Sequence, residues 1–174
     1  CPNVKHGTSF STDPRIAERV TRDVRAVTSR PVIAKLTPNV TSISEIGLAC
    51  QNGGADAVSA INTLVGMSVN IVSKRPKLAT ITGGYSGPAI KPIALAKVFE
   101  LAQKLTIPVI AIGGIATAQD ALEFMIAGAS AFQVGTVNFY EPDATIKIKK
   151  DLENYCRENN IQRLRDIIGV IQTS

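Results

Sequence analysis

The sequence predicts an α/β fold, namely the second half of a TIM (β/α)8 barrel. Four runs of branched apolar residues, which begin at residues 32, 57, 109 and 131, are typical of strands buried on both faces. These starts are spaced by 25, 52 and 22 residues, and helical patterns fill the intervals, as in a parallel βα sheet. The long interval corresponds to one unit plus an insertion. We therefore expect about four βα units, so that residues 1–174 form the C-terminal half of one barrel domain.

Capping residues and prolines indicate where the helices begin. Asp13 before Pro14 predicts a helix start, because proline is well accommodated at the first helical position. Further caps are expected at Ser42 with Glu45, at Thr117 with Asp120 and at Asp143. Pro92 begins the helix after the insertion, and the side chains expected to face inward from it are Ile93, Ala96, Phe99 and Leu105.

The insertion after the second strand is predicted to be an antiparallel hairpin. Met67–Val72 and Lys77–Thr82 have strand-like composition, and Lys74–Pro76 between them is rich in turn formers. A glycine-rich loop, Gly83–Pro88, then leads into the next helix. The hairpin would therefore lie in a strand-to-helix loop of the barrel.

Composition bounds the possible functions. With 174 residues, 45% hydrophobic and 19% charged, the chain has the composition of one globular domain with a substantial core. The net charge is +5, but the basic residues are dispersed and tryptophan is absent, so we expect no nucleic-acid partner. No apolar run is long enough for a membrane span. Three cysteines without metal-ligand spacing predict a reducing, cytoplasmic location and no metal site.

Two glycine-containing strand ends predict a phosphate site. Gly113-Gly114 follows the strand at 109, and Gly135-Thr136 follows the strand at 131. If these strands are parallel neighbours, both ends lie at the same carboxyl-terminal rim. Backbone amides, the threonine hydroxyl and a helix N-terminus could then hold a phosphate there. A single glycine pair is more often a plain turn, but its recurrence at consecutive strand ends favours phosphate binding.

Two α/β architectures are compatible with the pattern. A complete doubly wound sheet fits the length, but it leaves the opening Cys1-Pro2-Asn3, which no strand precedes, without a role. Half of a barrel explains this opening, although it would expose two strand edges of the buried type. We favour the barrel half.

Several motifs are spread over essentially the whole chain, namely Cys1-Pro2-Asn3, Ala34–Asn39, Ile61–Thr63, Gly83–Pro92, Gly113–Ile115 and Val134–Thr136. In their order and spacing they resemble the second half of a class 1 dihydroorotate dehydrogenase. Within class 1, Asn62-Thr63 and the following Leu64–Met67 look most like the class 1B catalytic subunit. Tyr85 departs from the leucine expected in the family, which affects only local packing.

The resemblance implies FMN-dependent oxidation of (S)-dihydroorotate to orotate in de novo pyrimidine biosynthesis. It implies Cys1 as the catalytic base, since a thiol with a pKa of about 8.5 can be poised as a thiolate. It also implies a homodimer, or a heterotetramer with an FAD and 2Fe-2S subunit that passes electrons to NAD. The residues implied to bind substrate are Asn3, Asn62 and Thr63, and those implied to bind FMN are Lys35, Ile61, Gly87, Gly113, Gly114, Gly135 and Thr136.

Lys35 also has a physical argument of its own. A lysine within an apolar strand is costly to bury unless an anion accompanies it, and a flavin that becomes anionic on reduction would supply one. The competing interpretation is a lysine that reaches solvent from a strand end. Lys91, which precedes Pro92, is expected to be solvated.

Other functions compete with this one. A class 1A enzyme would pass its electrons to fumarate, and the flavin domain of a dihydropyrimidine dehydrogenase has a very similar Ala34–Asn39 stretch. A non-catalytic phosphate-binding module is the third alternative. The residues leave the electron acceptor open.

Overall fold

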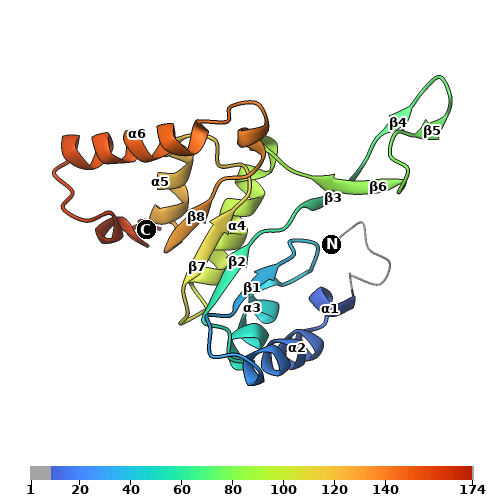
Figure 1. The fold of residues 1–174 in the computed structure, drawn as a ribbon, viewed down its shortest axis with the longest axis horizontal. Coiled ribbons are helices and arrows are strands. Elements are labelled where there is room, and N and C mark those ends of the chain that lie inside the picture. The colour runs from blue at the N-terminus through green and yellow to red at the C-terminus, as the bar shows by residue number, and fades with distance from the viewer. Residues whose placement is uncertain (1–8, 174) are drawn as a thin grey trace.

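The computed structural model describes residues 9–173, and its centre is a parallel β-sheet (Figure 1). The strands follow the order β1-β2-β7-β8, and all neighbours are parallel. Each predicted apolar run forms one of them. The strands are β1 (Ile33–Leu36), β2 (Ala57–Ala60), β7 (Val109–Ile112) and β8 (Ala131–Gln133).

Helices follow the strands in the alternation that the sequence predicts. Asp13 and Ser42 cap α2 and α3 through their side chains, and Thr117 with Asp120 forms a complete capping box on α5. Asp143 is the N-cap of α6 but makes no capping hydrogen bond with its side chain, contrary to expectation. The helices are α1 (Ser9–Thr12), α2 (Pro14–Ala26), α3 (Ile43–Asn52), α4 (Lys91–Ala102), α5 (Ala118–Ile126) and α6 (Ala144–Glu158), with short 3-10 turns η1 (Pro88–Ile90), η2 (Thr136–Phe139) and η3 (Leu164–Ile167).

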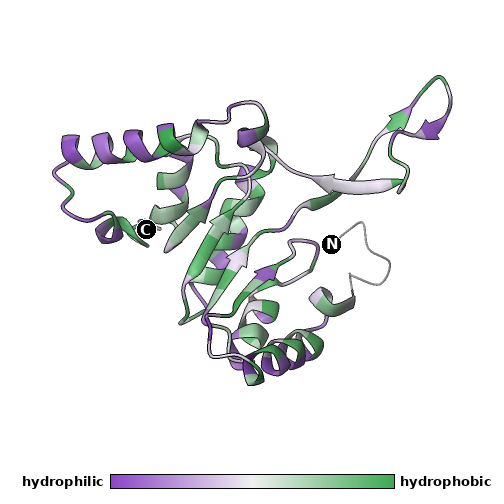
Figure 2. Cartoon of the chain, viewed as in Figure 1, coloured by the Kyte–Doolittle hydropathy of each residue, from purple (hydrophilic) through white to green (hydrophobic). Residues whose placement is uncertain are grey.

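Helices cover only one face of the sheet. Leu36, Val58 and Ala111 point to the covered face and are buried. Their neighbours Lys35 and Gln133 point to the opposite face and are exposed. A doubly wound sheet would be covered on both faces, so this one-sided arrangement supports half of a barrel, whose inner face is left open. Figure 2 shows the apolar residues concentrated on the strands and on the adjoining helix surfaces.

The core lies between the sheet and its helices. The largest fully buried side chains there are Phe124, Ile43, Ile90, Leu101, Val58 and Val98. On α4 the inward-facing residues are Ala94, Val98 and Leu101, whereas Ile93 is 43% exposed. The predicted inward face was therefore wrong for Ile93 and Ala96, which are exposed, whereas Leu105, just after the helix, packs against the core. The predicted and the observed residues both have helical spacing, and packing against the sheet selects Ala94, Val98 and Leu101.

The predicted insertion forms a projecting arm, residues 64–85 (Figure 1). Its base pairs β3 (Leu64–Met67) with β6 (Thr82–Tyr85), and its outer part pairs β4 (Val69–Asn70) with β5 (Arg75–Pro76). The antiparallel hairpin is confirmed, but the turn lies at residues 71–74 and Gly83-Gly84 belongs to a strand. A Cβ at Gly84 would lie 2.9 Å from Cβ of Thr63. The glycine thus allows β6 to approach Thr63, which directly precedes β3.

The two edge strands of the sheet carry apolar surface. Ile33 of β1 is 50% exposed, and Val24 of α2 is 44% exposed. Beside β8, a groove is lined by Phe132, Leu152 and Leu164. Half of a closed barrel would have such surfaces at both edges.

Candidate functional site

A cavity of about 370 Å³ lies at the carboxyl ends of the strands. Its lining comes from the loops that follow β2, β6, β7 and β8, and from Lys35 of β1. Cys1 and Asn3 lie outside the described residues. All the other residues predicted for the site line the cavity, and these are Lys35, Ile61, Asn62, Thr63, Gly87, Gly113, Gly114, Gly135 and Thr136.

The loop after β7 has a backbone that only glycine adopts readily. Gly113 and Gly114 have φ values of 133° and 77°. A Cβ on Gly113 would lie 2.9 Å from Cβ of Ala94, and one on Gly114 would lie 2.7 Å from the backbone nitrogen of Lys91. Both glycines therefore let the loop turn sharply against the beginning of α4, which brings the cavity rim close to η1 and α4.

The loop after β8 meets the loop that leaves the arm. Thr136 donates a hydrogen bond from its hydroxyl to Oγ of Ser86, at 3.1 Å. Gly87, with φ of 98°, lies beside the methyl group of Thr136. Apart from Gly135 itself and its chain neighbours, no described residue has an atom within 4 Å of where a Cβ on Gly135 would be. The space beside Gly135 is consequently available to a ligand in the cavity.

Asn39 organises the entrance to the arm, a role that the sequence did not indicate. Its Nδ2 donates to the carbonyl oxygen of Thr63, and its Oδ1 accepts from the backbone nitrogen of Val65, both at 3.0 Å. The backbone nitrogen of Asn62 donates to the carbonyl oxygen of Leu36 at 2.8 Å. Asn62 and Thr63 are thus held beside the end of β1, where they line the cavity.

Lys35 lines the cavity but is not buried. Because β1 is an edge strand with an open inner face, its side chain is exposed. Within residues 9–173, Lys35 is therefore not a buried lysine in need of an anion, contrary to the expectation. No ion pair to Lys35 forms within residues 9–173, so its ammonium group remains available to an anionic ligand.

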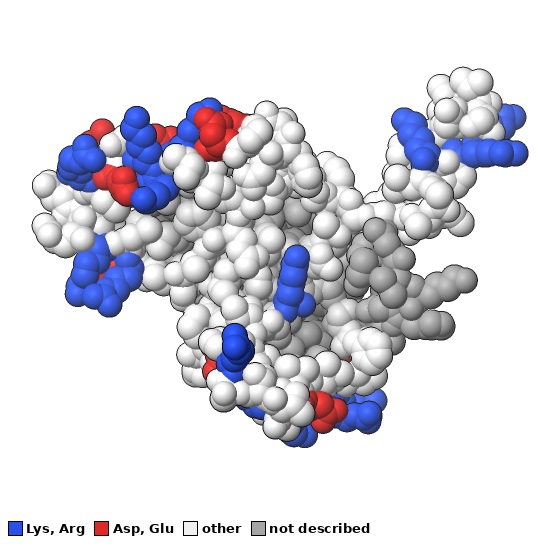
Figure 3. Space-filling model, viewed as in Figure 1, with Lys and Arg blue, Asp and Glu red and all other residues white. Residues whose placement is uncertain are grey.

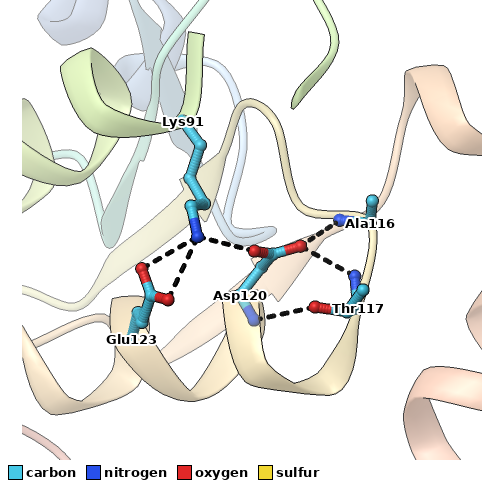
Figure 4. A network of polar contacts seen from close by, with 5 residues as sticks. All are labelled: Lys91, Ala116, Thr117, Asp120 and Glu123. Carbon is cyan, nitrogen blue, oxygen red and sulfur yellow. Dashed lines mark hydrogen bonds and ion pairs between the residues drawn. The ribbon is translucent and has the colours of Figure 1, made fainter. Parts of the chain in front are cut away.

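Lys91 is paired instead of being solvated as expected (Figure 4). Its Nζ lies 2.7 Å from Oδ1 of Asp120 and 3.0 Å from Oε1 of Glu123. The hydrogen bond to Asp120 raises the pKa of Lys91. Burial would raise the pKa of Asp120, but hydrogen bonds from Lys91 and from the backbone of Ala116 and Thr117 outweigh it and lower that pKa. Both groups are therefore charged at neutral pH.

The cavity has further lining residues that the sequence reasoning missed. Phe139 on η2 is 92% exposed, and Asn138 beside it donates from Nδ2 to the carbonyl oxygen of Val134. Ser86 contributes the hydroxyl that Thr136 bonds. Asn138 and Phe139 directly follow Gly135-Thr136, and Ser86 lies opposite Thr136. This position was the signal that could have indicated them, since residues that follow a strand end share its rim.

The described part of the chain shows neither a candidate metal site nor a candidate membrane-spanning helix. Residues 9–173 contain no cluster of His, Cys, Asp or Glu that could hold a metal ion. No helix among them has the length and hydropathy needed to cross a membrane. Figure 3 shows basic and acidic side chains mixed on α6, whereas the arm carries only basic ones, Lys74, Arg75 and Lys77.

Comparisons with known proteins agree with this arrangement. Two similar curated proteins are each named dihydroorotate dehydrogenase B (NAD(+)), catalytic subunit. The one from Geobacter sulfurreducens is 53% identical over 173 residues, which are 99% of this chain and 57% of that protein. The one from Alkaliphilus oremlandii is 50% identical over 170 residues, which are 97% of this chain and 56% of that protein. The chain thus spans little more than half the length of these relatives.

A solved structure shares the fold. It is DHODH from Eimeria tenella, in complex with ferulenol, with a TM-score of 0.79 and 25% identity. The match covers 97% of this chain and 51% of that one. The family described as Dihydroorotate dehydrogenase matches residues 1–156. The chain belongs to the dihydroorotate dehydrogenase family.

Proposed function

We propose that this chain is the C-terminal half of a flavin-binding barrel that oxidises (S)-dihydroorotate to orotate in pyrimidine biosynthesis. FMN, when bound, supplies the acceptor for the substrate's hydride. The observation that carries the proposal is the convergence of nine predicted residues, drawn from separate segments, on one cavity at the strand ends. The names of the similar proteins support the same activity.

The residues around the cavity suit the parts of FMN. Backbone amides of Gly113, Gly114, Gly135 and Thr136 are proposed to hold the phosphate, and the open space at Gly135 leaves room for it. The free ammonium of Lys35 is proposed to stabilise the negative charge of the reduced flavin ring. Ile61 and Gly87 would approach the flavin through their backbones.

Substrate binding and proton removal are assigned to loop residues. Asn62 and Thr63 line the cavity and offer the donors and acceptors that a pyrimidine ring requires. Cys1 is proposed to take the proton from C5 of the substrate, and Asn3 to bind the pyrimidine. These two residues lie outside the described part of the chain, so their roles rest on the family resemblance.

The proposal includes partners and a location. We propose a homodimer that joins an FAD and 2Fe-2S subunit into a heterotetramer, through which electrons reach NAD. The similar proteins named as catalytic subunits support a partner subunit. Cys50 and Cys156 are free thiols, which fits a reducing cytoplasm.

The experiment that tests this function follows the flavin in the full-length protein. Purified protein should be yellow, and anaerobic addition of dihydroorotate should bleach the flavin absorbance. Dihydrouracil, added in the same way, should leave it unchanged. Cys1→Ser should still bind flavin but be reduced at least about 100-fold more slowly at neutral pH, because a general base typically contributes that much.

Other outcomes would select the competing functions. Bleaching by dihydrouracil would indicate a dihydropyrimidine dehydrogenase-like domain. Reoxidation by fumarate, without any partner subunit, would indicate a class 1A enzyme. Protein without flavin absorbance would indicate a non-catalytic phosphate-binding module and would refute the proposal.

A further inference from the structure

The charged cluster of Lys91, Asp120 and Glu123 lies next to the cavity rim without lining the cavity. Lys91 begins α4, and both carboxylates belong to α5, so the cluster joins the two helices (Figure 4). The side chain of Lys91 is 25% exposed and that of Asp120 is 14% exposed. An ion pair this far withdrawn from solvent is less screened than a surface pair. Any influence of the cluster on a ligand must pass through the residues that it holds.

Asp120 connects the cluster to the glycine loop. Its Oδ1 accepts from Nζ of Lys91, and its Oδ2 accepts from the backbone nitrogens of Ala116 and Thr117, each at 2.9 Å. Ala116 itself lines the cavity, two residues after Gly114. Both carboxylate oxygens are therefore occupied, and one of them fixes the end of the loop that begins at Gly113.

Lys91 contacts the same loop a second time, through its backbone. The position of a Cβ on Gly114 would lie 2.7 Å from the nitrogen and 2.9 Å from Cα of Lys91. The middle of the loop thus rests against the first residue of α4. Its end is tied to the side chain of that residue through Asp120. Lys91 therefore constrains the loop at two points, and both lie at the rim where the phosphate is proposed to bind.

We propose that Lys91 and Asp120 are positioning residues that hold the loop of residues 113–117 in the shape that binds the flavin phosphate. The inference rests on the proposed function and deepens it by naming what preorganises the phosphate site. Lys91 is already ion-paired with two carboxylates, so it acts on the phosphate through the loop and not by direct contact of its ammonium group. Loss of the tie should allow the loop amides to sample shapes that bind phosphate less well.

Lys97 offers a matched control for Lys91. Both lysines lie on α4, and their side chains are 25% (Lys91) and 22% (Lys97) exposed. Lys91 pairs with two carboxylates and Lys97 with one. The partner of Lys97, Glu100, accepts hydrogen bonds from Ser44 of α3 and makes none to the rim. Lys91→Met and Lys97→Met therefore each remove one positive charge from α4 at a similar exposure, with two ion pairs lost in the first and one in the second. Of the two substitutions, only Lys91→Met releases the glycine loop.

The test compares FMN with riboflavin, which lacks the phosphate. Flavin-free full-length protein is titrated with each compound, and the Kd is measured from flavin fluorescence. Lys91→Met should raise the Kd for FMN about tenfold and leave that for riboflavin within about twofold, since couplings carried through a network are of this size. Lys97→Met should change neither Kd. Lys91→Arg, which keeps the charge, should recover most of the FMN affinity.

A second measurement reports on the phosphate itself. The 31P resonance of bound FMN should shift in Lys91→Met and return towards the wild-type position in Lys91→Arg. Equal losses of affinity for both flavins, or an unchanged Kd for FMN, would overturn the positioning role. If Lys91→Met does not fold, Asp120→Asn takes its place with the same expected and opposing results. Wild-type protein that binds no FMN would refute the proposed function instead.

Discussion

Three glycines at the cavity rim meet different physical requirements. Gly113 and Gly114 have positive φ, and each lies where a Cβ would overlap α4. Gly135 has φ of −117°, and apart from its chain neighbours no described residue has an atom within 4 Å of the position of its missing Cβ. The sequence makes the three look equivalent, because each is a glycine after a strand. The structure separates two that shape the loop from one that leaves space in the cavity.

We predict that Gly114→Ala destabilises the protein by about 2–4 kcal/mol. The methyl group would overlap the backbone of Lys91, and alanine is strained at φ of 77°. Urea unfolding of the full-length protein, followed by circular dichroism, measures the free energy of unfolding. Gly135→Ala is the matched control, since its methyl group would lie within 4 Å of no described residue other than its chain neighbours. It should change this free energy by less than about 1 kcal/mol, and a larger loss there would contradict this account.

At the level of elements, the strands were easier to predict than their partners. Each of the four sheet strands is a short apolar run, and this signal is local, so all four were found. The arm was predicted as a hairpin, but its pairing was not, because Gly83-Gly84 has the composition of a loop and becomes a strand only against Leu64–Met67. The inward face of α4 was missed for a related reason. Two sets of positions have helical spacing, and only tertiary packing chooses between them.

We predict that Asn39 fixes the base of the arm from the loop that follows β1. Asn39→Ala removes the hydrogen bonds to Thr63 and Val65 and should lower the free energy of unfolding by about 1 kcal/mol. Amide hydrogen exchange should become faster at residues 62–66, beside the cavity, in a measurement by mass spectrometry on the full-length protein.

Asn70 provides the control for that substitution. Its Oδ1 accepts from the backbone nitrogens of Val72 and Ser73 at the far end of the arm. Asn70→Ala should therefore speed exchange only at the arm's tip. Unchanged exchange at residues 62–66 in Asn39→Ala would show that the entrance to the arm is held by other contacts.

At the level of the whole molecule, the placement of the site followed from topology. Parallel strands end at a common rim, so the residues after β7 and β8 were predicted to lie side by side. They line one cavity together with the residues after β2, which the family resemblance had indicated. The pairing of Lys91 with Asp120 could not be predicted in this way. The two residues are 29 positions apart, and their contact depends on how α4 and α5 pack against each other.

The open edges of the sheet lead to a prediction for residues 1–174 produced alone. Strand β1 has no partner on its outer side among the described residues, and Ile33 on it is 50% exposed. An unpaired edge with apolar side chains favours pairing with another chain. We expect association that grows with concentration in sedimentation velocity, and Ile33→Lys should weaken it. Ile93→Lys, at a 43% exposed position on α4 away from the edges, should not; equal effects of the two substitutions would point to a general loss of apolar surface rather than to the strand edge.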